Sequence, residues 1–145
     1  MIEYYEIIGR LVLALLLGAM IGVERIHAGK TAGLRTFALV ALGSALFVLI
    51  SEQVIANYGY EIDPLRVASN LVTGVGFLGA GMIIFREDHI SNLTTAAGVW
   101  LSAAIGAAIG FGLYVEAITT TILVIVTFTF MWNLEHYLKE RFTKK

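Results

Sequence analysis

Three acidic side chains stand close together in the longest polar stretch of the sequence, between residues 51 and 66. They are Glu52, Glu61 and Asp63. Carboxylate oxygens are ligands that Mg²⁺ accepts, and Mg²⁺ keeps several of its waters at sites with few protein ligands. These residues are therefore candidate ligands of an external cation site, with Mg²⁺ as ligand or substrate. The sequence gives no reason to expect any other cofactor.

Catalytic chemistry has no such support. The chain contains no cysteine, which removes disulfides and thiolate metal sites. No nucleophile, base and orienting group occur together in the sequence. The letters Gly74-Val-Gly76-Phe-Leu-Gly79 match a dinucleotide fingerprint, but they lie inside an apolar stretch with no room for a βαβ unit. We therefore expect that the protein is not an enzyme.

Polar side chains inside the apolar stretches are the next candidates. Arg10 lies near the start of the first stretch, where it is either an interfacial anchor or an ion-pair partner facing other helices. Asn70 and Thr73 are three residues apart and share one face of a helix. Such residues either mark a substrate path or form hydrogen bonds between helices.

A cluster of charged residues joins the apolar stretches on one side. Its members either brace loops and contact anionic lipid headgroups, or they gate a path or dock a partner. They are Glu24, Arg25, Lys30, Arg35 and Arg86.

The elements that position these residues are apolar helices. The chain of 145 residues is 58% hydrophobic and only 14% charged, with mean hydropathy +0.81. Blocks of about 20 apolar residues suit membrane-spanning helices. We predict an all-α protein with five transmembrane helices in a compact bundle over residues 1–132, followed by a basic amphipathic tail over 133–145. The helices are expected at about Ile7–Val23, Leu34–Ile55, Leu65–Phe85, Leu93–Gly110 and Val115–Trp132.

Small residues recur along these helices. Glycine lets two membrane helices approach closely, so the segment Asn70–Phe85 is expected to form the packing centre. The helices over 65–85 and 93–110 should be central, the last helix peripheral, and a homodimer is plausible. The packing residues are Gly18, Gly22, Gly74, Gly76, Gly79, Gly81, Gly98, Ser102, Gly106 and Gly110.

The positions of lysine and arginine predict the orientation. Eight lie in the first loop region, the third loop and the tail, whereas the opposite side has Arg10 and Arg66. The positive-inside rule places the tail in the cytoplasm and the N-terminus outside. The bilayer is the expected partner. The formal charge of −1 gives no reason to expect a nucleic-acid partner.

Several motifs resemble those of the MgtC/SapB membrane proteins. They are Gly18-Ala-Met-Ile-Gly22-Val-Glu24-Arg25, Gly33-Leu-Arg35-Thr36, Asp63-Pro64-Leu-Arg66, and Gly74 to Gly81 followed by Leu93-Thr94-Thr95-Ala-Ala-Gly-Val-Trp100. The resemblance implies a bacterial inner-membrane protein of magnesium homeostasis, associated with virulence in some members. It implies a transporter or permeation path, or a non-transporting regulator of another membrane complex such as the F-type ATP synthase.

Two features depart from the family pattern. Family members often carry a C-terminal cytoplasmic domain resembling ACT folds, and we interpret this chain either as a short member or as a member from which that domain has been removed. Asn92 precedes Leu93 at a place where the family pattern leads us to expect glycine.

Overall fold

The computed structural model describes residues 3–59, 63, 65–86 and 89–142. Long helices dominate: α1 (Tyr4–His27), α2 (Leu34–Tyr58), α3 (Leu65–Met82), α4 (Leu93–Gly110), α5 (Tyr114–Val126) and α6 (Trp132–Phe142). A π-helical turn, η1 (Thr127–Met131), joins α5 and α6, and a short hairpin, β1 (Ile84–Arg86) and β2 (His89–Ser91), joins α3 and α4. The predicted all-α class is confirmed.

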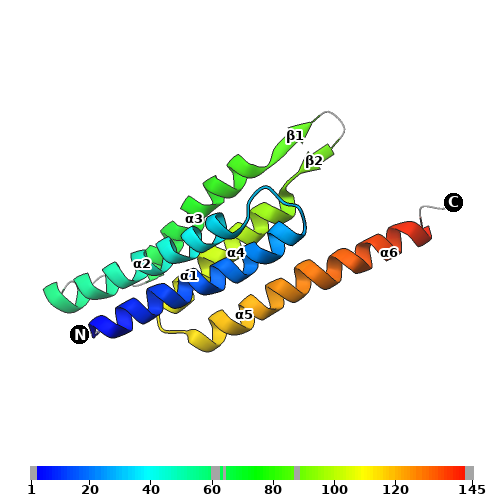
Figure 1. The fold of residues 1–145 in the computed structure, drawn as a ribbon. Coiled ribbons are helices and arrows are strands. Elements are labelled where there is room, and N and C mark those ends of the chain that lie inside the picture. Colours follow the sequence, from blue (N-terminus) through cyan, green and yellow to red (C-terminus); the bar gives the residue numbers. More distant parts are fainter. Residues whose placement is uncertain (1–2, 60–62, 64, 87–88, 143–145) are drawn as a thin grey trace.

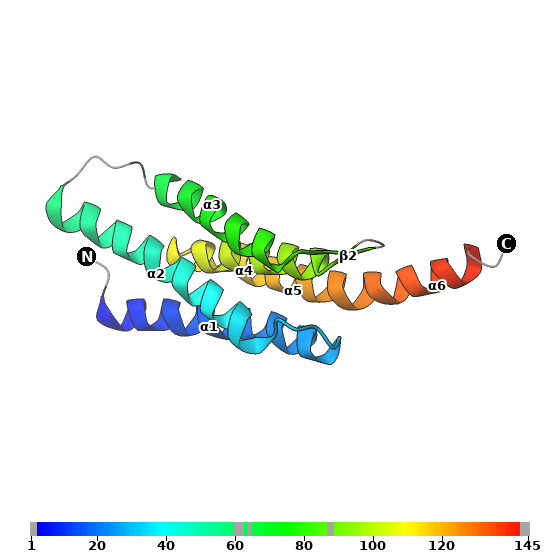
Figure 2. The same ribbon diagram turned by 90° about the horizontal axis from the view of Figure 1, so that it is seen from above.

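The helices run up and down as parallel and antiparallel rods (Figure 1). Four of them in the described chain are long and apolar enough to span a membrane: Tyr4–His27, Leu34–Tyr58, Leu93–Gly110 and the continuous rod Tyr114–Phe142. The fifth rod, α3, lies alongside this group (Figure 2). It follows α2 in the chain and leads through the hairpin to the start of α4. The two termini lie at opposite ends of the bundle (Figures 1 and 2).

The packing centre consists of α1, α2 and α4. A Cβ atom built at Gly18 would lie 2.6 Å from the carbonyl oxygen of Phe37, and one at Gly106 would lie 2.1 Å from that of Ala41. Gly22 and Gly110 meet α2 or its preceding loop just as closely, and Ser102 donates a hydrogen bond to the Phe37 carbonyl at 2.8 Å. These small residues form rows that step by four along α1 and α4. The helices therefore touch along their backbones.

The expectation that α3 forms the packing centre is wrong. Val75 and Gly79 are its buried residues, and a Cβ at Gly74, Gly76 or Gly81 would meet nothing within 4 Å. The physical reason is spacing. Residues 74 and 81 lie on one face of a helix and residues 76 and 79 on another, so the four glycines do not form a single close-packing row.

The last apolar rod and the tail form one helix. The predicted span ends at Trp132 and the predicted amphipathic tail follows it, and in the structure α5, η1 and α6 continue without a break to Phe142, so that α6 extends beyond the other helices (Figure 1). One narrow face of α5 and η1 is buried, through Ala117, Thr121, Val124 and Phe128. The expectation of a peripheral last helix is consistent with this. The cytoplasmic location of the tail stays a prediction.

The α3–α4 connection explains the unexpected Asn92. Its φ is +66°, a left-handed conformation that glycine or asparagine adopts at low cost. Its side-chain amide also donates to the Met82 carbonyl at 3.2 Å, which caps the end of α3. Helix α3 therefore ends at Met82 instead of Phe85, and Phe85 pairs with Ile90 in the hairpin.

Asp63 caps the start of α3. Its Oδ1 accepts a hydrogen bond from the Leu65 backbone N–H at 2.9 Å. We expect Asp63→Ala to lower the free energy of unfolding by about 1 kcal/mol, because that N–H loses its acceptor. Asp63→Asn should restore most of it. Denaturant titration of the full chain in detergent would measure the free energy of unfolding of both variants. Equal stability of Asp63→Ala and the wild type would contradict the cap.

Candidate functional site

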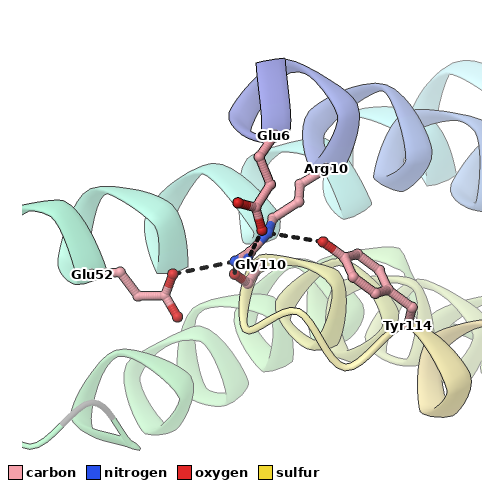
Figure 3. Close-up of polar contacts among 5 residues, drawn as sticks. All are labelled: Glu6, Arg10, Glu52, Gly110 and Tyr114. Atoms are coloured by element: carbon pink, nitrogen blue, oxygen red, sulfur yellow. Dashed lines mark hydrogen bonds and ion pairs between the residues drawn. The ribbon is translucent and has the colours of Figure 1, made fainter. Parts of the chain in front are cut away.

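Arg10 on α1 contacts α2, the end of α4 and the start of α5 (Figure 3). Its Nη2 lies 2.6 Å from Glu6, and its Nη1 donates to Glu52 at 3.3 Å and to the Gly110 carbonyl at 2.6 Å. Its Nε donates to the Tyr114 hydroxyl at 3.0 Å. The side chain is only 11% exposed. Of the two readings left open by the sequence, the bundle-facing ion pair is the one found.

The fork of the guanidinium explains why arginine suits this position. The last carbonyls of α4 have no partner within the helix, and Arg10 satisfies that of Gly110. The turn into α5 has Gly112 at φ +77°, and a Cβ there would lie 3.2 Å from Nη2. We name Glu6, Arg10, Glu52, Gly110 and Tyr114 the Arg10 cluster.

Two residues of the Arg10 cluster, Glu6 and Tyr114, are not among the candidates that the sequence indicates. Glu6 is four residues before Arg10, so helical spacing alone could have indicated the pair. Tyr114 is 104 residues away in sequence, and no local signal links it to Arg10. Glu52 had been assigned to a cation site.

The proposed cation site does not assemble in the described chain. Glu52 turns to Arg10, Asp63 caps α3, and Glu61 lies outside the described residues, as does the adjacent Pro64. Among the described residues, no three histidine, aspartate or glutamate side chains are grouped so that they could hold a metal ion.

A second charged pair lies at the opposite end of the bundle. Arg25 is 3% exposed and pairs with Glu24. Its guanidinium carbon lies 3.6 Å from the centroid of the Phe128 ring, a cation–π contact. A Cβ at Gly98 would lie 2.7 Å from that ring, so the absence of a side chain there makes room for it. We name Glu24, Arg25, Gly98 and Phe128 the Arg25 cluster.

Two other members of the predicted charged cluster, Lys30 and Arg35, do not join this pair. Lys30 and Arg35 are exposed, and neither forms an ion pair with the part of the chain that is described. The backbone of Arg86 pairs with His89 in the hairpin, and its side chain lies outside the description. The tail lysines Lys144 and Lys145 also lie outside the described residues.

Asn70 and Thr73 do not face the bundle interior. Both are exposed on α3, and the Thr73 hydroxyl donates to the Ser69 carbonyl of its own helix at 3.3 Å. Asn70 instead lines a groove of about 600 Å³ between α2 and α3, which we name the α2–α3 groove. Its other walls are apolar or small, among them Leu39, Gly43, Phe47, Gly74 and Leu78.

Comparison with known proteins identifies the family. The model of the MgtC family matches residues 11–137. The chain belongs to the MgtC family. Among similar proteins, "Putative magnesium transporter YhiD" of Escherichia coli K12 is 49% identical over 113 residues, covering 75% of this chain and 53% of YhiD. No solved structure matches.

Two further relatives of this MgtC family chain differ in length. Protein MgtC of Salmonella typhimurium 14028s is 44% identical over 115 residues, covering 79% of this chain and 48% of that protein. Protein SrpB of Synechococcus elongatus is 44% identical over 128 residues, covering 81% of this chain and 70% of SrpB. The chain thus spans about half the length of YhiD and MgtC.

The family match begins at the residue after Arg10 and covers most of the two charged clusters. It includes Arg25, Glu52, Gly110, Tyr114 and Phe128, whereas Glu6 and Arg10 precede the matched range. The resemblance noted in the sequence is confirmed. The protein is a membrane protein by its apolar helices and its family.

Proposed function

We propose that this MgtC family protein acts in magnesium homeostasis as a non-transporting regulator, which binds a helix of another membrane complex. The observation that carries the proposal is the packing of α1, α2 and α4. Their backbones are in contact at Gly18, Gly22 and Gly106, so the space between these helices has no width for a hydrated cation. The open surface lies outside them, in the α2–α3 groove.

Ion-paired side chains occupy both ends of the central helices. Arg10 pairs with Glu6 and Glu52 at one end, and its guanidinium also donates to the Gly110 carbonyl. Arg25 pairs with Glu24 at the other end and packs on the Phe128 ring. Each of these carboxylates therefore has an arginine as its partner and is not an unpaired ligand for an entering Mg²⁺.

The α2–α3 groove fits an uncharged transmembrane helix. Gly43 and Gly74 line it and leave open space where side chains would stand, so a helix backbone can come close. The Asn70 amide is the polar group on one wall. An unpaired amide in hydrocarbon is costly in free energy, so a hydrogen-bonding partner on the entering helix would stabilise the complex. A second copy of this chain is the competing occupant.

The alternative function is transport of Mg²⁺, and the name of the relative "Putative magnesium transporter YhiD" favours it. For the same protein we propose a bacterial inner-membrane location, with the N-terminus outside and the C-terminus in the cytoplasm. The excess of lysine and arginine at the end of the bundle with residues 28–33 supports that orientation.

Two measurements on reconstituted protein test the proposal. Liposomes containing the full chain should show no Mg²⁺ flux above empty liposomes, and flux above that level would support transport instead. Proton pumping by a co-reconstituted F-type ATP synthase should fall when the chain is present. Unchanged pumping, or a complex that contains two copies of this chain alone, would contradict this choice of partner.

Groove variants give the control for this experiment. Gly43→Leu and Gly74→Leu should abolish the effect on pumping, because each side chain fills space that the groove now leaves open. Gly76→Leu is the matched control, since it also points into open space but lies outside the groove. Equal effects of all three variants would remove the groove from the proposal.

A further inference from the structure

A second groove, of about 590 Å³, lies between α1 and the continuous helix formed by α5, η1 and α6. We name it the α1–α6 groove. On α1 its wall includes Met20, Val23 and Glu24, and on the other helix it includes Ile125 and Asn133. The two helices run in the same direction (Figure 1). The C-terminal part of one wall therefore lies beside the C-terminal part of the other.

The polarity of this groove changes along its length. Its inner part has Met20, Val23 and Ile125, and its outer part has His27, Thr129 and Asn133 together with Glu24. Met20 and His27 are seven residues apart, which is about 10 Å along a helix. A wall that passes from apolar to polar over that distance matches an amphiphile with an acyl chain and a headgroup.

The position of Trp132 sets the level of the polar part. Tryptophan favours the boundary between hydrocarbon and headgroups. Trp132 lines the groove at its polar end and is about half exposed. The polar part of the groove therefore lies where lipid headgroups lie, and the apolar part faces the acyl chains.

The outer part presents two acceptors on α1. Arg25 binds Oε2 of Glu24, while no described group bonds the other carboxylate oxygen, Oε1. Nδ1 of His27 lies 2.9 Å from the Val23 carbonyl, so this nitrogen must donate. In the neutral ring Nε2 is then an acceptor.

The opposite wall presents donors. The Asn133 amide and the Thr129 hydroxyl are exposed there, and both can donate to a phosphate or an ester oxygen. The groove lining contains no lysine or arginine among the described residues. An anionic headgroup without its own cation therefore has no charge partner in the groove.

We infer that the α1–α6 groove binds a phospholipid whose headgroup carries a primary ammonium. A primary ammonium has three N–H donors, which suit Glu24 and His27, whereas a quaternary ammonium has none. The phosphate faces Asn133 and Thr129, and one acyl chain lies against Met20, Val23 and Ile125. This site is separate from the α2–α3 groove and does not depend on the proposed regulation.

Lipid retention by the full chain in detergent tests this inference. Native mass spectrometry would measure which lipids stay bound. Phosphatidylethanolamine should be retained about tenfold better than phosphatidylcholine with the same acyl chains, because the charged hydrogen bonds are lost with the methylated headgroup. Equal retention of the two lipids, stronger retention of phosphatidylglycerol, or a protein segment seated in the groove would overturn it.

Variants separate the headgroup from the acyl chain. Glu24→Gln should bring the ratio of the two lipids to about one, and Glu116→Gln, an exposed glutamate at the other end of the rod, should leave it unchanged. Met20→Trp should reduce retention of both lipids, since it fills the apolar part of the groove without changing a charge. This variant serves if Glu24→Gln fails to fold, and unchanged retention in Met20→Trp would contradict the site.

Discussion

Replacing Gly106 by leucine should prevent the bundle from assembling. A Cβ atom alone would lie 2.1 Å from the Ala41 carbonyl oxygen and 2.8 Å from the Ala41 Cα. These are backbone atoms of α2, which cannot move aside as the end of a flexible side chain can. Overpacking a tight contact typically costs about 1–3 kcal/mol, and a leucine against a backbone should exceed that range. The melting temperature in detergent and the elution volume would measure the loss.

The control for Gly106 is a glycine that faces open space. Gly76→Leu adds the same side chain where a Cβ meets nothing within 4 Å. We expect it to leave the melting temperature near the wild-type value or to raise it, because leucine favours helix more than glycine does. If Gly106→Leu had the same melting temperature as the Gly76→Leu control, α2 and α4 would not be in backbone contact.

Replacing Arg10 by leucine should be the second most damaging change. It removes four hydrogen bonds and leaves the carboxylates of Glu6 and Glu52 without their cation. Breaking a buried pair costs about 3–5 kcal/mol, but both carboxylates are partly exposed, so we expect about 2–3 kcal/mol. Arg10→Lys should lose less, because it keeps the charge while losing the fork.

Two controls separate charge from position. Arg66→Leu changes an exposed arginine at the same end of the bundle and should have little effect. Adding Glu6→Gln and Glu52→Gln to Arg10→Leu should recover part of the stability, since the uncompensated charges are then gone. A triple variant that is less stable than Arg10→Leu would show that the carboxylates stabilise the fold in another way.

Local sequence features predicted much of the fold. Apolar blocks located the helices because unpaired backbone groups have no partner in hydrocarbon, which leaves the helix as the available structure. The rows containing Gly18, Gly22 and Gly106 step by four residues, and a row of that kind marks one face of one helix. The contact of Asp63 at the start of α3 is equally local, since a cap acts within a few residues.

The candidate sites depended on contacts across the chain. The sequence places Glu52 and Asp63 in one polar stretch and so suggests a shared cation site, but in the fold Glu52 forms an ion pair with Arg10 on another helix. Tyr114 contacts Arg10 and Phe128 contacts Arg25 only because the helices pack side by side, and no local sequence pattern indicates these contacts. Asn70 was expected to face inward, and the position of α3 at the edge turned it toward the α2–α3 groove.

The sequence by itself determined that this protein is an all-α membrane protein of the MgtC family, with glycine rows that bring helices together. Only the tertiary structure decided which helices those rows join, and therefore that α1, α2 and α4 form the centre. It also decided which charges meet at each end and which grooves stay open. The physical reason is that helix formation and capping act over a few residues, whereas ion pairs and grooves depend on which helices become neighbours.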